Sequence, residues 1–207
     1  MNAALRVSLR TLRACAAFGL APHAADQPPE RALVERLAGL VSPTSRMLIT
    51  GASGSGKTRL ARAVASALHA RGMRVVRADP ARGSPRSNEG ILDVLPGPLP
   101  FACSLLARVG LADATLLTRR VGELSEGEGF RLLLARALSR GPDVLVADEF
   151  CSALDSRLAR NLTLSICSRA GCALVLVTAR EEVARWVRAD VVVTCTRGES
   201  PRTEILS

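Results

Sequence analysis

Hydrophobic residues along the chain occur either in short continuous runs or at helical spacing. The continuous runs predict buried strands, and the spaced segments predict helices that cover a sheet. Strand and helix alternate, which is typical of a parallel sheet with helices on both faces. We expect strands at Met47–Thr50, Met73–Ala78, Val144–Ala147, Ala173–Thr178 and Asp190–Thr194, and helices at Arg31–Leu40, Lys57–Ala70, Phe101–Leu117, Glu126–Ser139, Ala153–Arg169 and Glu181–Arg188.

Two segments interrupt this alternation. Asp79–Pro100 is rich in Pro, Gly, Ser and Arg, which predicts a long, mobile connection. We regard it as a candidate surface for contact with a partner. The residues after Arg197 form a polar tail, and Asp190–Thr194 is expected to be the last strand.

Size and charge narrow the class of protein. A chain of 207 residues with 48% hydrophobic content is sufficient for one domain with a sizeable core. No apolar run is long enough for a membrane helix, so membrane insertion is not expected. The net charge of +9 comes from arginines spread along the whole chain, and Lys57 is the only lysine. A net positive charge also favours binding to a polyanion, so nucleic acid is a further candidate partner.

The cysteines and the N-terminus both favour a cytoplasmic protein. The six cysteines show no metal-binding or redox spacing, which favours buried reduced thiols. The first 25 residues hold arginines and no acid. This composition is typical of a transit peptide but equally of an amphipathic helix, and we interpret the segment as part of a cytoplasmic protein.

The segment Gly51–Thr58 matches the phosphate-binding pattern G-x-x-x-x-G-K-[ST] in full, between a predicted strand and a predicted helix. Glycines let backbone amides point at phosphate oxygens, and the helix N-terminus adds partial positive charge. Lys57 is expected to contact the β- and γ-phosphates, and Thr58 to bind Mg²⁺. A glycine-rich turn without a ligand is the alternative. The candidate nucleotide-binding residues are Gly51, Ser53, Gly54, Ser55, Gly56, Lys57 and Thr58.

Two acids, Asp148 and Glu149, end the apolar run Val144–Ala147. The carboxyl ends of parallel strands meet at the edge of the sheet where ligands bind. Asp148 is therefore expected to hold Mg²⁺, directly or through water, and Glu149 to act as general base toward the attacking water. A solvated acidic turn is the alternative, which the neighbouring phosphate loop disfavours.

Two further motifs accompany these acids. The segment Leu124-Ser-Glu-Gly-Glu128 precedes a predicted helix, and Ser152-Ala-Leu-Asp155 follows the acids. Together with the phosphate loop, this order of motifs resembles the ABC-type ATPases over roughly Met47–Val193. Leu124–Glu128 corresponds to the family's signature, usually LSGGQ, and Ser152–Asp155 to its D-loop. Ser125 and Gly127 match the signature, whereas Glu126 and Glu128 depart from it.

The resemblance implies an α/β P-loop NTPase fold, with a mostly parallel sheet, helices on both faces and a reduced ABC helical subdomain. It implies one domain over 1–207, with N-terminal edge elements (1–45), a nucleotide-binding core (46–196) and a reduced helical insert (79–124). The ligands implied are ATP and Mg²⁺, with Lys57 and Glu149 as catalytic residues and Thr58 and Asp148 as metal ligands.

The resemblance also implies an ATP-dependent homodimer or heterodimer. Each ATP would lie between the phosphate loop of one subunit and Ser125 and Gly127 of the other. The sequence looks most similar to soluble bacterial and phage members, which occur alone or near acetyltransferase-like domains.

Several positions depart from the family pattern. Ala179 stands where members usually carry a histidine that senses the γ-phosphate, so we expect slow hydrolysis, with Arg180 as a substitute cation. The only glutamine is Gln27, so the family's Q-loop glutamine is missing. Phe18 is a weak candidate for stacking on adenine. The short interval between Lys57 and Ser125 leaves little room for the subdomain that docks on a transporter.

The leading hypothesis is a soluble ATPase that acts as an ATP-dependent dimer switch on an unknown protein partner. One alternative is a regulatory nucleotide-binding module that hydrolyses weakly. A second is the ATP-binding subunit of a transporter. A third is a small-molecule kinase with Arg82–Arg86 in its lid, which would need neither the signature nor the D-loop.

Overall fold

The computed structural model describes residues 17, 28–80 and 88–206. The strands are β1 (Arg46–Thr50), β2 (Val75–Ala78), β3 (Val144–Ala147), β4 (Ala173–Val177), β5 (Val191–Thr194) and β6 (Arg202–Ile205). The helices are α2 (Arg31–Gly39), α3 (Lys57–Ala70), α4 (Leu99–Arg108), α5 (Ala114–Leu117), α6 (Glu126–Leu138), α7 (Ser156–Arg169) and α8 (Glu181–Val187), with a 3₁₀ turn, η2, at Val121–Glu123.

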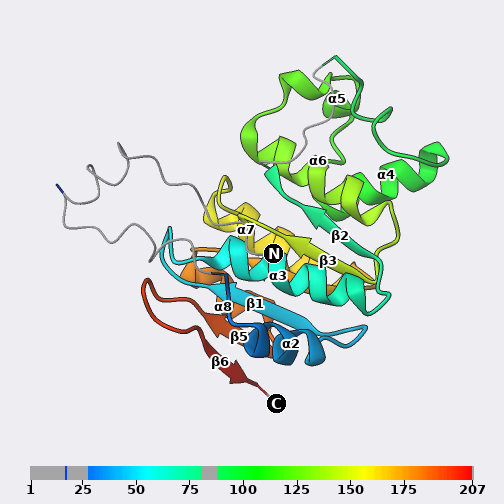
Figure 1. Ribbon diagram of the computed structural model, residues 1–207. Coiled ribbons are helices and arrows are strands. Elements are labelled where there is room, and N and C mark those ends of the chain that lie inside the picture. The colour runs from blue at the N-terminus through cyan, green and yellow to red at the C-terminus, as the bar shows by residue number, and fades with distance from the viewer. Residues whose placement is uncertain (1–16, 18–27, 81–87, 207) are drawn as a thin grey trace.

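The strands form one sheet in the order β2-β3-β4-β1-β5-β6, as Figure 1 shows. The pairs from β2 to β5 are parallel, and β6 pairs with β5 antiparallel. The carboxyl ends of the parallel strands therefore lie at one edge, where the phosphate loop follows β1 and the two acids follow β3. The predicted fold class, a mostly parallel sheet with helices on both faces, is confirmed.

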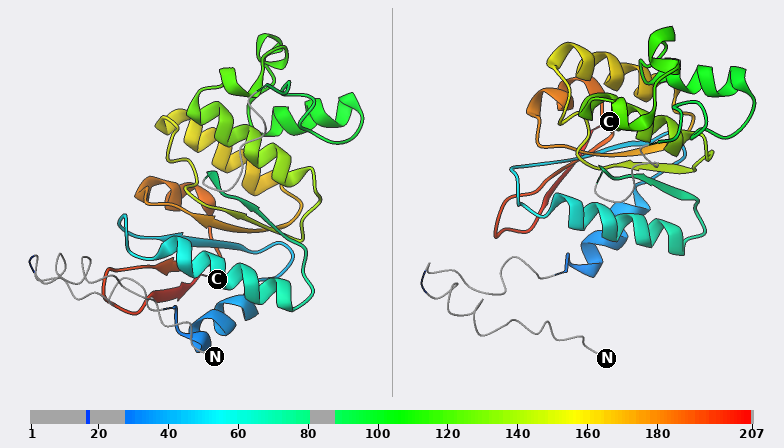
Figure 2. Two further views of the ribbon diagram at one scale, coloured as in Figure 1. Left: turned by 45° about the horizontal axis from the view of Figure 1, so that its top comes forward. Right: turned by 90° about the horizontal axis from the view of Figure 1, so that it is seen from above.

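Each face of the sheet has its own core. Helices α2 and α3 cover one face, and α4, α6, α7 and α8 cover the other (Figure 2). Successive residues of β1 point to opposite faces, so Met47 and Ile49 pack with α3, while Leu48 packs with the other cluster. Strands β3 and β4 are buried along their whole length, which explains their continuous apolar runs.

The connection after β2 differs from the mobile loop that the sequence predicts. Over 88–98 it is tied to the segment before η2, since the Ile91 N–H donates to the Arg119 carbonyl (3.2 Å) and the Val121 N–H donates to the Glu89 carbonyl (2.9 Å). The Ile91 side chain is fully buried. The prediction was wrong here because it followed the many Pro and Gly residues of the segment and gave no weight to its few apolar residues, of which Ile91, Val94 and Leu95 are buried. Residues 81–87, which include all of Arg82–Arg86, lie outside the described residues.

The polar C-terminal segment contains a further strand, although Asp190–Thr194 was expected to be the last one. β6 lies at the edge of the sheet with mostly exposed side chains, so it lacks the apolar pattern of a buried strand. The Arg36 guanidinium, on α2, donates a hydrogen bond to Thr203 Oγ1 (3.2 Å) and links β6 to the neighbouring helix.

One helix starts later than predicted. Helix α7 begins at Ser156 rather than Ala153, because the Asp155 carboxylate accepts a hydrogen bond from the Leu158 N–H (2.9 Å) and caps the helix. The predicted helix Phe101–Leu117 is two helices, α4 and α5, with Gly110 at positive φ in the segment between them.

The described cysteines are all free, as expected, although two of them are only half-buried. Burial raises the pKa of Cys151 to about 12, which keeps this thiol protonated and unreactive. None of the described helices is both long and apolar enough to cross a membrane. Cys15, Phe18, Gln27 and almost all of the basic N-terminal segment lie outside the described residues.

Candidate functional site: a phosphate loop, two acids and a signature helix

The phosphate loop joins β1 to α3 in a conformation that depends on glycine. Gly51 has φ 136°, and a Cβ at this position would lie 2.1 Å from the Cys195 carbonyl oxygen. Gly54 and Gly56 also have positive φ, 75° and 92°. A residue with a side chain is strained at such angles, so the pattern of glycines is required by the backbone path.

Lys57 lies beneath this loop, at the first position of α3. Its ammonium donates to the Gly51 carbonyl (2.9 Å) and to the Ala52 carbonyl (2.8 Å), and the residue is only 7% exposed. The single lysine of the chain is thus enclosed by the loop that is expected to bind phosphate. Ser55 Oγ, in the same loop, is buried and has no hydrogen-bond partner in the structure. A buried hydroxyl of this kind fits an oxygen-rich ligand such as a phosphate.

A hydroxyl and a carboxylate meet beside the loop. Thr58 Oγ1 donates a hydrogen bond to Asp148 Oδ1 at 3.1 Å, and Asp148 is buried. The Asp148 N–H donates to the Ala78 carbonyl (2.9 Å), so the neighbouring strand β2 fixes the position of the acid. Hydroxyl, carboxylate and phosphate oxygens are the ligands that Mg²⁺ prefers, so this pair fits a magnesium ion bound with a nucleotide.

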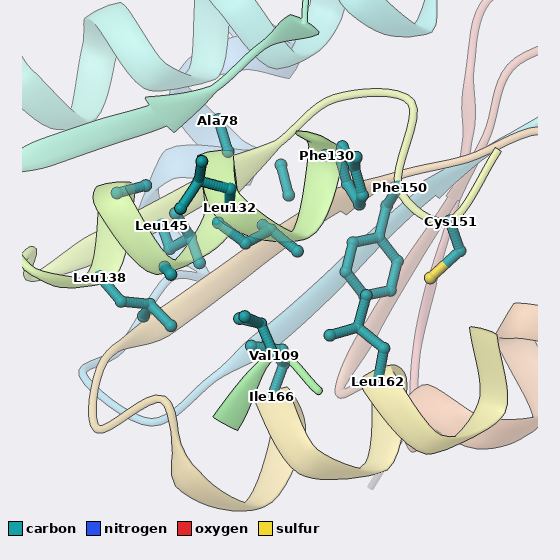
Figure 3. Packing of buried hydrophobic residues seen from close by; sticks show 14 of the residues in the cluster. Ala78, Val109, Phe130, Leu132, Leu138, Leu145, Phe150, Cys151, Leu162 and Ile166 are labelled. Atoms are coloured by element: carbon teal, nitrogen blue, oxygen red, sulfur yellow. The ribbon is translucent and has the colours of Figure 1, made fainter. Parts of the chain in front are cut away.

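The second acid, Glu149, is exposed because the chain turns sharply after β3. Glu149 and Cys151 both have positive φ, 51° and 64°. Between them Phe150 is fully buried, with its N–H donating to the Val177 carbonyl (2.7 Å) and its ring in edge contact with Phe130, 6.1 Å between centroids. Figure 3 shows Phe150 pointing into the core between Phe130 and Leu162. The buried ring holds the turn in place while the carboxylate of Glu149 faces out.

Ser125 and Gly127 begin helix α6. Ser125 is its N-cap: Ser125 Oγ accepts from the Glu128 N–H (3.3 Å), and the Glu128 carboxylate accepts from the Ser125 N–H (2.8 Å). This reciprocal pair is a capping box. The hydroxyl serves as acceptor in the cap, so its own hydrogen is available to a phosphate oxygen. The hydrogen bond from Ser125 also lowers the pKa of the Glu128 carboxyl.

Gly127 packs directly against the D-loop. A Cβ on Gly127 would lie 2.8 Å from Leu154 Cδ2 and 3.0 Å from the Ala153 carbonyl oxygen. The signature and the D-loop, far apart in sequence, are therefore in contact. The structure brings Thr58 and Asp148 together beside Lys57, and it packs Gly127, two residues after Ser125, against the D-loop.

Three interactions here are not among the predicted site contacts. Glu128 caps α6, which the pattern S-x-x-E would have indicated. Arg131 is buried and donates to the carbonyls of Gly127 (3.3 Å) and Gly110 (2.6 Å), which no local pattern signals. Arg180, expected to be a cation near the γ-phosphate, instead directs its guanidinium to the D-loop, through the carbonyls of Cys151 (2.8 Å) and Leu154.

Comparison with known proteins places the chain in a family. Residues 42–187 match the AAA domain family, and this stretch covers well over half of the chain. The protein therefore belongs to the AAA domain family. Its fold is that of an AAA-type P-loop NTPase with the architecture of an ABC transporter ATPase cassette.

The sequence relatives match only part of the chain. The macrolide export ATP-binding/permease protein MacB of Burkholderia pseudomallei is 37% identical over 95 residues, which are 45% of this chain and 14% of that protein. The methionine import ATP-binding protein MetN of Bradyrhizobium diazoefficiens is 41% identical over 92 residues, 43% of this chain and 26% of that protein. The chain thus spans a small part of the length of these relatives.

The structural neighbours extend further along the chain. The dimeric bacterial ABC transporter cassette MJ0796 superposes with a TM-score of 0.66 at 20% identity, covering 81% of this chain and 88% of that one. A bacterial Atm1-family ABC exporter with ATP bound superposes with a TM-score of 0.63 at 19% identity, covering 80% of this chain and 34% of that one. At such low identity these likenesses establish the fold.

Proposed function

We propose that this protein binds ATP with Mg²⁺ and hydrolyses it as an ABC-type ATPase, and that the bound ATP joins two subunits. The observation that carries the proposal is the 3.1 Å contact between Thr58 and Asp148 beside an exposed Glu149. It joins the helix that follows the phosphate loop to the strand that ends in two acids. A solvated acidic turn would not place a buried carboxylate on the hydroxyl of the phosphate-binding motif.

Each site residue has a defined task in this reaction. The loop amides and the Lys57 ammonium bind the β- and γ-phosphates and stabilise negative charge that moves toward the leaving group. Thr58 and Asp148 would hold Mg²⁺, which would supply positive charge to the phosphate oxygens. Glu149 accepts a proton from the water that attacks the γ-phosphorus. That attack breaks the bond between the γ-phosphorus and the bridging oxygen, leaving ADP and inorganic phosphate.

The dimer is supported by the distribution of the motifs. Ser125 is exposed at the start of α6, and Gly127 beside it packs against the D-loop, so the start of this helix is available to an ATP held by a second copy. The structural neighbour MJ0796 is described as a dimeric cassette. ATP between two subunits would then control assembly, and hydrolysis would release it. We further propose a cytoplasmic protein of the soluble, acetyltransferase-associated type, acting on a protein partner.

The test is substitution of the general base. Glu149→Gln keeps the size of the side chain but cannot accept the proton, so steady-state phosphate release should fall about a hundredfold. The same variant should form a dimer on a sizing column with MgATP and stay monomeric with MgADP. Glu199→Gln, which changes an exposed acid elsewhere, is the control and should behave like the unmodified protein. An unmodified protein that releases no phosphate, or a Glu149→Gln variant that is indifferent to ATP, would refute the proposal.

The same assays separate the alternatives. Phosphate release without an added acceptor argues against a small-molecule kinase. A rate far below that of relatives with the histidine, restored by Ala179→His, would identify the missing histidine as the cause of slow hydrolysis. Stimulation of hydrolysis by DNA at low salt would add nucleic acid as a partner, and its loss at high salt would confirm phosphate contacts.

A transporter subunit is the second candidate function. Two relatives are named as an export and an import ATP-binding protein, and α4 exposes Leu99 (61%) and Phe101 (42%) at its start. Large exposed apolar residues at the start of one helix favour a contact surface there. If this candidate holds, the protein should sediment with membranes of its source cells, and Leu99→Ser together with Phe101→Ser should release it.

A further inference from the structure

Arg180 lies in the turn between β4 and α8 and binds several groups of a different segment. Its guanidinium donates to the carbonyls of Cys151 (2.8 Å) and Leu154, to Ser156 Oγ (3.1 Å) and to the Glu182 carboxylate. The Ser156 hydroxyl in turn donates to the same carboxylate (2.9 Å). One side chain thus holds the whole D-loop from its beginning to the first turn of α7.

The chemistry of this contact requires arginine. A guanidinium presents five N–H donors in a fixed planar fork, which suits two carbonyls, a hydroxyl and a carboxylate at once. Lysine has three donors on a single flexible point charge and is unable to span the same set. The Arg180 side chain is 22% exposed, so these charge-assisted bonds are partly shielded from water.

The D-loop connects the two parts of the site. On one side, Cys151 ends the strained turn that carries Glu149, since both residues have positive φ. On the other side, Leu154 touches Gly127, at the start of the signature helix. Arg180 binds the carbonyls of both Cys151 and Leu154. A shift of the D-loop would therefore displace the general base and the signature together.

We infer that Arg180 is a positioning residue that fixes Glu149 relative to the signature, so that the base of one site and the γ-phosphate contacts of the other are set by one guanidinium. The inference rests on the proposed function, because it concerns the same hydrolysis and the same dimer. It replaces the expectation that Arg180 contacts the γ-phosphate itself. In this role Arg180 touches neither ATP nor Mg²⁺.

The inference predicts a particular kinetic signature. Arg180 donates to the D-loop and to α8, whereas Lys57 and Thr58 belong to the separate nucleotide-binding group, so its loss should leave ATP affinity unchanged. For Arg180→Ala we expect kcat to fall about tenfold to a hundredfold, as small displacements of reacting groups do, with KM for ATP within about twofold. Arg180→Lys should give an intermediate kcat. Arg160→Ala removes an exposed arginine of α7 and is the charge-matched control with unchanged kcat and KM.

A second readout follows dimer formation. In the Glu149→Gln background, Arg180→Ala should weaken the ATP-dependent dimer on a sizing column, while binding of a fluorescent ATP analogue to the monomer stays the same. Ser156→Ala removes one acceptor of Arg180 and Glu182→Gln removes the negative charge of another, so each should lower kcat by a smaller factor. Thermal unfolding of each variant shows whether it is folded. If Arg180→Ala does not fold, the Ser156 and Glu182 variants test the positioning role in its place.

The outcomes separate the two proposals. Suppose that the unmodified protein hydrolyses ATP. If Arg180→Ala, or the Ser156 and Glu182 variants in its place, then retain full kcat and the ATP-dependent dimer, the positioning role is wrong and the proposed function stands. A rise in KM with kcat unchanged would also overturn it, because it would put Arg180 in ATP binding. If the unmodified protein releases no phosphate, the proposed function fails first.

Discussion

At the scale of single residues, the phosphate loop constrains which side chain can stand at position 57. Every basic residue of this chain other than Lys57 is an arginine. The structure gives a physical reason for the exception, because the Lys57 ammonium fits between two backbone carbonyls of the loop and is almost fully buried. A planar guanidinium is larger and needs more acceptors than this site offers.

Substitution of Lys57 by arginine should therefore be as damaging as substitution by alanine. We expect both Lys57→Arg and Lys57→Ala to reduce ATP hydrolysis more than a hundredfold, because the charge alone, misplaced by the larger group, does not stabilise the transferred phosphate. Steady-state phosphate release measures this. Retention of more than a tenth of the activity in Lys57→Arg would show that the site tolerates a guanidinium and that the single lysine carries no information. The exposed-residue variant Arg160→Ala again serves as control.

Among the elements, α6 depends most visibly on the acids of the signature. Glu126 and Glu128 depart from LSGGQ, the usual signature of the ABC-type ATPases that the sequence resembles, and Glu128 forms the second half of a capping box, as a Gln at this position can also do. Carboxylates in the first turn of a helix also interact favourably with its partial positive charge. What the departure from LSGGQ adds is this negative charge, which stabilises the start of the helix that carries Ser125 and Gly127.

This cap should depend on pH. The hydrogen bond from the Ser125 N–H lowers the pKa of Glu128 from its ordinary value of 4.5, against an opposing effect of burial. A lowered pKa in the folded state means that the stabilisation is complete above the ordinary value and is lost as the pH falls through the folded value. Glu128→Ala should therefore cost about 1 kcal/mol in the free energy of unfolding at neutral pH, and nearly nothing once the carboxyl is protonated.

Urea unfolding of both proteins at several pH values measures this difference. Glu199→Ala, at an exposed turn, should show no such pH-dependent gap. A gap for Glu128→Ala that stays constant down to strongly acid pH would mean that the carboxylate charge does not contribute to the cap.

The helices and strands differ in how well the sequence predicts them. Strands β3 and β4 were predictable because both of their faces are buried and their residues are continuously apolar, and β1 and β5 because each contains a run of three apolar residues. β6 was not, because an exposed edge strand has no apolar pattern, and the ordering of 88–98 depends on pairing with a distant segment. The phosphate loop and Asp148 follow from local motifs. The contacts of Arg180 and Arg131 join segments far apart in the chain, so no spacing rule indicates them.

At the scale of the whole molecule, the proposed dimer places a negatively charged helix start against a negatively charged ligand. Glu126 is exposed and stands at the first position of α6, between Ser125 and Gly127. If these two residues face the ATP of a second copy, the Glu126 carboxylate lies near the γ-phosphate and repels it. Glu128 contributes less to this repulsion, since its carboxylate is bound to the Ser125 N–H.

Removal of that charge should therefore strengthen the dimer. In the Glu149→Gln background, Glu126→Gln should lower the dissociation constant of the ATP-bound dimer by about threefold to tenfold, the range expected for one unit charge several ångströms away in a partly solvated seam. The gain should shrink at high salt, because salt screens exposed charges. Glu199→Gln provides the control for a change in net charge alone. Analytical ultracentrifugation with MgATP gives both dissociation constants, and an unchanged or weaker dimer for Glu126→Gln would mean that the start of α6 does not face the nucleotide.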